Sequence, residues 1–214
     1  MTHVKSFTFN AFSENTFILF DDESRAAIVV DPGCYTTNEQ KQLQQFITDN
    51  KLTVKRLINT HCHLDHVFGN RFVSETYAVQ LEAHRAELPV LAKAHISADR
   101  FGVPMPMQEP FDIFIEDGDE ITLGEATFKV ILAPGHSPGS LCFYNEKEGF
   151  LIGGDVLFFR SIGRTDLPGG SHAQLIESIT TRLFALPDAT KVFCGHGQPT
   201  TIGYERFNNP FLNG

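Results

Sequence analysis

The sequence predicts an α+β fold in which helices flank a β-sandwich. Two stretches, residues 4–59 and 120–194, contain short runs of alternating apolar and polar side chains, which are typical of strands. Apolar residues at helical spacing interrupt both stretches, near residues 36–50 and 172–186. A chain of 214 residues can bury one core of its own, so we expect a single domain over residues 1–214.

The N-terminal third is expected to form β-hairpins followed by a β-α-β unit. The turn signal Asp31-Pro32-Gly33 ends the third run of alternating residues. A helix then begins at a capping threonine, Thr36 or Thr37, and places Leu43 and Ile47 on one face. The strands predicted here are residues 4–9, 16–20, 25–30 and 54–59.

The rest of the chain is expected to form a second strand-rich half after a less regular middle. Residues 71–75 and 84–94 are compatible with helices, and residues 101–110, with three prolines, are expected to form a loop. A helix is predicted over residues 172–186 and a short closing one over 201–208. The strands predicted here are residues 120–123, 127–133, 141–144, 150–153 and 191–194.

Composition excludes several classes of function and location. The formal charge is −9 and no basic run occurs, so we expect no nucleic-acid partner. No run approaches the roughly 18 apolar residues of a membrane span, and the first 20 residues lack the pattern of a signal peptide. The four cysteines form no C-x-x-C pair. We therefore expect a cytoplasmic protein with reduced thiols and no membrane partner.

The segment Thr60-His61-Cys62-His63-Leu64-Asp65-His66 indicates a metal site. Four side chains of the kind that bind metals lie within six residues, directly after the strand predicted at 54–59. Such a group is costly to bring together unless a divalent cation offsets the charges. His61 and His63 are two residues apart and can converge on one ion, which leaves Asp65 and His66 for a second. A solvated polar loop would not need this many ligand-type residues.

Three more strand ends carry residues of the same type. His136 lies in Pro134-Gly135-His136-Ser137-Pro138-Gly139, Asp155 follows Gly153-Gly154, and His196 follows Cys194-Gly195. The glycines permit tight turns around a site. Cys62 is interpreted as a packing residue because alternation along the chain points it away from the metals. Cys194 is interpreted as a buried strand residue.

The order H-x-H-x-D-H, G-H-S-P-G, G-G-D and C-G-H resembles the metallo-β-lactamase superfamily, over nearly the whole chain. The resemblance implies a four-layer αβ/βα sandwich with the site at one edge. It places His61, His63 and His136 on a first metal and Asp65, His66 and His196 on a second. The resemblance also implies that Asp155 bridges the two metals.

The implied ligands also indicate the metals and the reaction. Imidazole and carboxylate ligands without a thiolate suit Zn²⁺, with Fe²⁺ or Mn²⁺ as alternatives. Two such ions about 3.5–4 Å apart can share a hydroxide, because they lower the pKa of its parent water from 15.7 towards ~7. Asp65 and Asp155 are the expected catalytic residues: Asp65 orients the hydroxide and Asp155 holds both ions.

Within the superfamily the chain most resembles the glyoxalase II (hydroxyacylglutathione hydrolase) group. Members that hydrolyse antibiotics with a Cys ligand carry that Cys where this chain has Asp155, which argues against a β-lactamase. Arg164 matches the basic residue with which the family binds glutathione, and a guanidinium there can pair with a substrate carboxylate. The resemblance therefore implies a thioesterase whose small-molecule substrate is a glutathione thioester such as S-D-lactoylglutathione.

The chain departs from the full glyoxalase II pattern at its C-terminal end. Asp166 and Gln198 replace two tyrosines, and the sequence ends at Gly214, about where the family's helical domain begins. The closer resemblance is thus to the shorter, single-domain glyoxalase II-like hydrolases.

Two other functions stay open. A mononuclear iron persulfide dioxygenase of the same superfamily shares the Gly163-Arg164-Thr165-Asp166 segment and would hold iron with His61, His136 and Asp155 alone. A non-catalytic, metal-stabilised binding module is disfavoured by the intact ligand set. Lactonase or RNA-processing phosphodiesterase activity fits less well, since the charge disfavours RNA.

Overall fold

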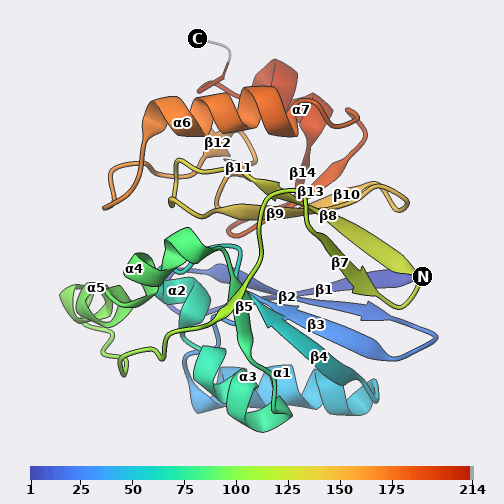
Figure 1. Cartoon of the computed structure of the whole chain (residues 1–214), viewed down its shortest axis with the longest axis vertical. Coiled ribbons are helices and arrows are strands. Elements are labelled where there is room, and N and C mark those ends of the chain that lie inside the picture. The colour runs from blue at the N-terminus through green and yellow to red at the C-terminus, as the bar shows by residue number, and fades with distance from the viewer. Residues whose placement is uncertain (213–214) are drawn as a thin grey trace.

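Two six-stranded sheets pack face to face in the computed structural model, which describes residues 1–212 (Figure 1). Helices α6 and α7 cover the outer face of one sheet, and α1 and α3 cover the outer face of the other (Figure 1). The predicted α+β sandwich with four layers is confirmed. Among the described residues, no helix is both long enough and apolar enough to cross a membrane.

The first sheet has the strand order β1-β2-β3-β4-β5-β6. Its first three strands pair antiparallel, and β3 to β6 pair parallel. Parallel neighbours bring their carboxyl ends to the same edge, which is where loops with functional residues gather. The strands are β1 Thr2–Phe9, β2 Glu14–Asp21, β3 Ala26–Val30, β4 Thr53–Ile58, β5 Leu81–Ala83 and β6 Ile113–Phe114.

The second sheet has the order β14-β13-β10-β9-β8-β7, and a small hairpin of β11 and β12 lies beside it. β10 and β13 are parallel, so their ends also point to one edge. The strands are β7 Glu120–Leu123, β8 Ala126–Leu132, β9 Leu141–Asn145, β10 Phe150–Gly154, β11 Leu157–Phe158, β12 Ser161–Ile162, β13 Lys191–Cys194 and β14 Thr200–Thr201.

The first long helix is capped by Thr36, one of the two threonines that the sequence offers for this role. Thr36 and Glu39 form a capping box, and the helix buries Leu43 and Ile47 against the first sheet. The helices are α1 Thr37–Asp49, α2 Leu64–Val67, α3 Asn70–Tyr77, η1 Arg85–Glu87, α4 Leu88–Leu91, α5 Ala94–Arg100, α6 His172–Glu177, η2 Ser178–Leu183 and α7 Ile202–Asn208.

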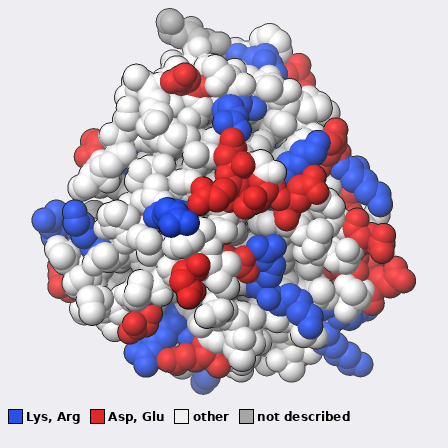
Figure 2. Space-filling model, in the orientation of Figure 1, with Lys and Arg blue, Asp and Glu red and all other residues white. Residues whose placement is uncertain are grey.

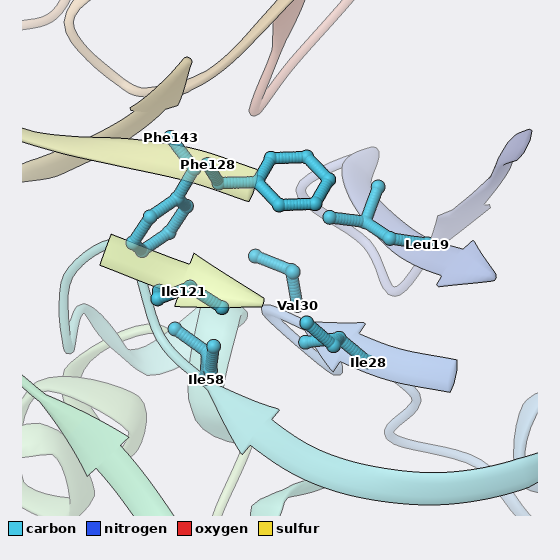
Figure 3. A pocket seen from close by; sticks show the side chains of 7 residues that line it. All are labelled: Leu19, Ile28, Val30, Ile58, Ile121, Phe128 and Phe143. Carbon is cyan, nitrogen blue, oxygen red and sulfur yellow. The ribbon is translucent and has the colours of Figure 1, made fainter. Parts of the chain in front are cut away.

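The main core lies between the two sheets. Figure 3 shows side chains from both sheets meeting there, and all seven of them are almost fully buried. Burial of this apolar surface is the main force that holds the sheets together. These side chains are Leu19, Ile28, Val30 and Ile58 from the first sheet and Ile121, Phe128 and Phe143 from the second.

The structure confirms most predicted elements and corrects two regions. The helix predicted over residues 172–186 ends at Leu183, after a π-helical turn. Between residues 64 and 115 the chain forms helices α2 to α5 and the short strands β5 and β6, of which only two helical segments were expected. The proline-containing segment 101–110 has no helix or strand, as predicted.

Charged side chains are unevenly spread over the surface. Figure 2 shows acidic side chains gathered across the middle of one face, with Lys and Arg side chains scattered around them.

Candidate metal centre

The seven residues predicted as ligands lie together at one edge of the sandwich. Four of them come from the segment after β4: His61 and His63 precede helix α2, and Asp65 and His66 lie within it. The others follow β8, β10 and β13 of the second sheet, so both sheets contribute to the centre. These others are His136, Asp155 and His196.

His61, His63 and His136 form a first group. Nδ1 of His63 lies 2.8 Å from Nε2 of His136, which lies 3.2 Å from Nε2 of His61. Burial, together with the neighbouring imidazoles, lowers the pKa of His61 and brings the pKa of His63 to about 3. Burial also lowers the pKa of His136. The group is therefore neutral at pH 7, the form in which imidazole binds a metal.

Asp65, His66 and His196 form a second group. Nε2 of His196 lies 3.2 Å from Oδ2 of Asp65, and Nε2 of His66 lies 3.8 Å from the same oxygen. Burial alone would lower the pKa of His196, but the carboxylates of Asp155 and Asp65 raise it to about 10. Burial would likewise lower the pKa of His66, and the same carboxylates raise it well above its usual value. The carboxylates therefore favour a positive charge at this group, and a bound metal cation would supply one.

Asp155 lies between the two groups. Its Oδ1 is 3.5 Å from Nε2 of His66, and its Oδ2 is 3.5 Å from Nε2 of His136 and 3.4 Å from Nε2 of His196. Burial would raise the pKa of Asp155, but His66 and His196 hold it well below the usual range. One carboxylate therefore contacts imidazoles of both groups.

The polar atoms of the centre fit divalent cations. Within residues 1–212, Oδ1 of Asp155 and Nε2 of His66 are buried without a hydrogen-bond partner. Buried polar atoms are rarely left in this state, and a cation would satisfy both. The nitrogen and carboxylate donors lack a thiolate, a set that suits Zn²⁺, Fe²⁺ or Mn²⁺.

Two glycines allow the chain to approach Asp155 closely. A Cβ atom on Gly195 would lie 2.1 Å from Oδ1 of Asp155, and one on Gly163 would lie 1.9 Å from its carbonyl oxygen. Neither glycine has a positive φ, so close approach rather than backbone conformation requires them.

Asp31 also contacts the centre, although the sequence was interpreted there only as a turn. Its Oδ2 lies 3.1 Å from Nδ1 of His66 and accepts from the Thr60 hydroxyl at 2.6 Å. Nδ1 of His61 is in turn 3.1 Å from that hydroxyl. A metal-binding histidine commonly donates its other N–H to a carboxylate in this way. The available signal was an acidic residue directly after a fully apolar strand.

Glu14 is a second buried acid that was not predicted. It is fully buried, accepts from the Thr16 hydroxyl at 2.9 Å, and has its Oε1 3.9 Å from Nδ1 of His66.

The structure places Arg164 beside the first group, with its side chain already paired. Its carbonyl oxygen accepts from Nδ1 of His136 at 2.7 Å, so the loop contacts that imidazole. Its guanidinium donates two hydrogen bonds of 2.8 Å to Asp166. A substrate carboxylate would have to compete with this pair.

The cysteines do not join the centre. All four are free and buried, and burial raises the pKa of Cys62 well above its usual value and that of Cys194 to about 12. A thiol in this state is a poor nucleophile and ligand.

The two-sheet sandwich with a His/Asp centre at its edge is an architecture that can be compared with known families. The metallo-beta-lactamase superfamily model matches residues 10–196. The chain belongs to this superfamily of metal-dependent hydrolases. It is 38% identical over 205 residues to hydroxyacylglutathione hydrolase GloC of Haemophilus influenzae. The match covers 95% of this chain and 94% of that relative.

Solved structures agree with this assignment. BLEG-1 B3 metallo-beta-lactamase superposes with a TM-score of 0.89 at 36% identity and covers 99% of this chain and 100% of that one. TTHA1623 in a di-iron-bound form gives 0.86 at 32% identity and covers 97% and 100%. ETHE1 from Myxococcus xanthus gives 0.80 at 25% identity and covers 97% and 83%.

Proposed function

We propose that this chain is a binuclear metal-dependent hydrolase of thioesters. The observation that carries the proposal is the position of Asp155, whose two oxygens contact imidazoles of both groups. A carboxylate placed in this way suits a bridge between two cations. In this proposal the first cation binds His61, His63 and His136, and the second binds Asp65, His66 and His196.

The cations, when bound, would supply a nucleophilic water and a Lewis acid for the thioester carbonyl. The chain's own residues orient the reactants. Asp65 lies at the second group and is available to accept a hydrogen bond from the attacking water. Nδ1 of His136 donates to the Arg164 carbonyl oxygen, which directs Nε2 into the centre.

A glutathione thioester is the proposed substrate. The similarity to GloC supports this class, and Arg164, whose backbone carbonyl contacts His136 of the first group, carries a guanidinium on the same loop. Because Asp166 already accepts both of its hydrogen bonds, we expect Arg164 to bind a remote carboxylate only weakly. Zn²⁺ is the proposed metal, and the di-iron form of TTHA1623 keeps iron as the alternative. We also propose a cytoplasmic location, supported by the unpaired thiols.

Two rival activities have specific support. The Gly163–Asp166 segment resembles the persulfide dioxygenases, which would need only His61, His136 and Asp155 for one iron. The similarity to BLEG-1 favours a trial of β-lactams, since the argument from Asp155 excludes only members with a Cys ligand.

The test combines metal analysis with paired assays on native protein and Asp155→Ala. We expect two metal equivalents and hydrolysis of S-D-lactoylglutathione in the native chain, and loss of both in the variant. Asp188→Ala, which removes only an exposed pair with Arg206, is the control and should change neither. Full metal content and turnover in Asp155→Ala would contradict the bridge.

The substrate panel separates the rivals. Oxygen consumption with glutathione persulfide, without thioester hydrolysis, would assign a dioxygenase. Turnover of β-lactams alone would assign a lactamase. A metal-loaded chain that is silent on these three, and also on a lactone and a phosphodiester, would indicate a non-catalytic binding module.

A further inference from the structure

Glu87 is a buried carboxylate outside the seven proposed ligands. It lies at the end of the short helix η1, and its side chain has no exposed surface. One oxygen, Oε2, accepts from the backbone N–H of Cys62 at 2.8 Å. The other, Oε1, accepts from the Ser137 hydroxyl and the Gly139 N–H, both at 2.6 Å.

The three donors belong to the two loops that carry the first group of imidazoles. Cys62 stands between His61 and His63, and Ser137 directly follows His136. These loops come from different sheets. Glu87 is therefore the one side chain that hydrogen-bonds to both, among the contacts that the described residues show.

The surroundings leave Glu87 little freedom. A Cβ atom on Gly139 would lie 2.9 Å from Cγ of Glu87. A buried carboxylate is costly unless donors satisfy it, and here three short hydrogen bonds do so. The carboxylate therefore holds its position, and the backbone donors are held with it.

We propose that Glu87 is a positioning residue that sets the spacing between the His61–His63 loop and the His136 loop. This role of Glu87 rests on the proposed function, because the two loops carry the imidazoles of the first cation site. Glu87 touches neither a proposed ligand side chain nor the substrate. Its effect is to hold three imidazoles in place before a cation binds, so that binding does not have to order them.

Glu87→Gln tests this role with little change of shape. The carboxamide has one oxygen, whereas both carboxylate oxygens face donors. Either the Cys62 N–H or the Ser137 and Gly139 donors must then face an NH₂ group. Ser137→Ala removes only one of the three hydrogen bonds and gives a milder second variant.

Glu205→Gln is a matched control. Glu205 is also fully buried and also accepts three hydrogen bonds, from Thr200, the Arg160 N–H and Asn209. None of these partners lies within three residues of a proposed ligand. The control therefore disturbs the fold in a similar way without touching the ligand loops.

The measurement is Zn²⁺ affinity by chelator competition, alongside the melting temperature of the metal-free proteins. His63→Ala and His196→Ala identify which equivalent belongs to which group. We expect Glu87→Gln to weaken the first-group equivalent by roughly 10- to 100-fold, Ser137→Ala by less, and Glu205→Gln not at all. The second-group equivalent should change little in all three.

Two results would overturn the positioning role. One is native first-group affinity in Glu87→Gln and Ser137→Ala, and the other is an equal loss in Glu205→Gln at a similar melting temperature. A native chain that binds no Zn²⁺ or Fe²⁺ would instead remove the proposed function itself.

Discussion

Replacing Asp31 by asparagine should weaken metal binding by the second group, because it would change which ring nitrogen of His66 carries the proton. Oδ1 of Asp31 accepts from the Thr60 N–H at 2.7 Å and from the Asn59 amide at 3.2 Å. Oδ2 lies 3.1 Å from Nδ1 of His66. Because a carboxylate only accepts hydrogen bonds, Nδ1 carries a proton, and the lone pair of Nε2 is available toward Asp155 once that nitrogen is deprotonated.

Asparagine reverses this arrangement. Its oxygen is retained at the Oδ1 position, because the Thr60 N–H and the Asn59 amide there can only donate, whereas the Thr60 hydroxyl at the Oδ2 position can turn to accept. The NH₂ group of the asparagine therefore faces Nδ1 of His66. Nδ1 must then accept, which leaves the proton on Nε2, the nitrogen that should bind a cation. Loss of such a partner typically lowers metal affinity by about 10- to 100-fold, or about 1.4–2.7 kcal/mol.

The assay is Zn²⁺ titration of metal-free protein against a competing chelator. Asp21→Asn is the control, because Asp21 accepts from Ser24 at the opposite end of β2. It should leave both affinities unchanged. If Asp31→Asn binds both equivalents as tightly as the native chain, the tautomer argument is refuted.

Three further results are expected. Gly195→Ala should lose a metal equivalent and at least tenfold in turnover, because its methyl group would overlap the Asp155 carboxylate, the proposed bridge; unchanged metal content would contradict this. Arg164→Ala should raise KM for a glutathione thioester but not for a simple thioester. Asp166→Asn should lower KM for the glutathione thioester by roughly two- to fivefold, because it frees the Arg164 guanidinium. Equal effects on both substrates would indicate a structural role. Burial raises the pKa of Cys34 and Cys142 to about 12, so the folded state keeps protons that the unfolded state loses above about pH 9. Stability should therefore fall as pH rises above 9, by up to about 1.4 kcal/mol per unit for each thiol, and urea unfolding of the double Cys→Ala variant should show a flatter slope.

Local pattern predicted the elements that build the centre because each of them is periodic and bounded by turn residues. The strand before His61 mixes apolar and charged residues, those before Asp155 and His196 are mainly apolar, and all three are followed by glycine or polar residues. Strands β5 and β6, of three and two residues, have too little periodicity to be recognised. Their pairing depends on parallel neighbours distant in sequence, which local pattern does not encode.

The same limit explains which residues of the centre were missed. A turn alone is enough to explain an aspartate in Asp31-Pro32-Gly33, so the sequence gives no reason to expect a contact. The contact of Asp31 with His66 joins residues 35 positions apart. Glu87 lies in a helical segment with no ligand motif, yet it contacts loops 25 and 50 positions away. Ligand residues are recognisable by type and clustering, whereas the residues that orient them are recognisable only from the fold.

The surroundings of the two groups differ in a way that would orient a thioester. The first group adjoins the Arg164 loop through the hydrogen bond of His136 to its carbonyl oxygen. At the second group, Nδ1 of His196 donates to the Phe12 carbonyl oxygen at 3.1 Å, and the Phe158 ring lies 6.1 Å from the His196 ring. Phe12 itself packs edge-on against Phe101, with the ring centroids 5.4 Å apart, so aromatic residues cluster near this contact. A substrate with a charged thiol portion toward Arg164 would therefore place its acyl group toward the phenyl rings. It follows that an apolar acyl group is favoured by burial there, whereas a second charge on the acyl group is not.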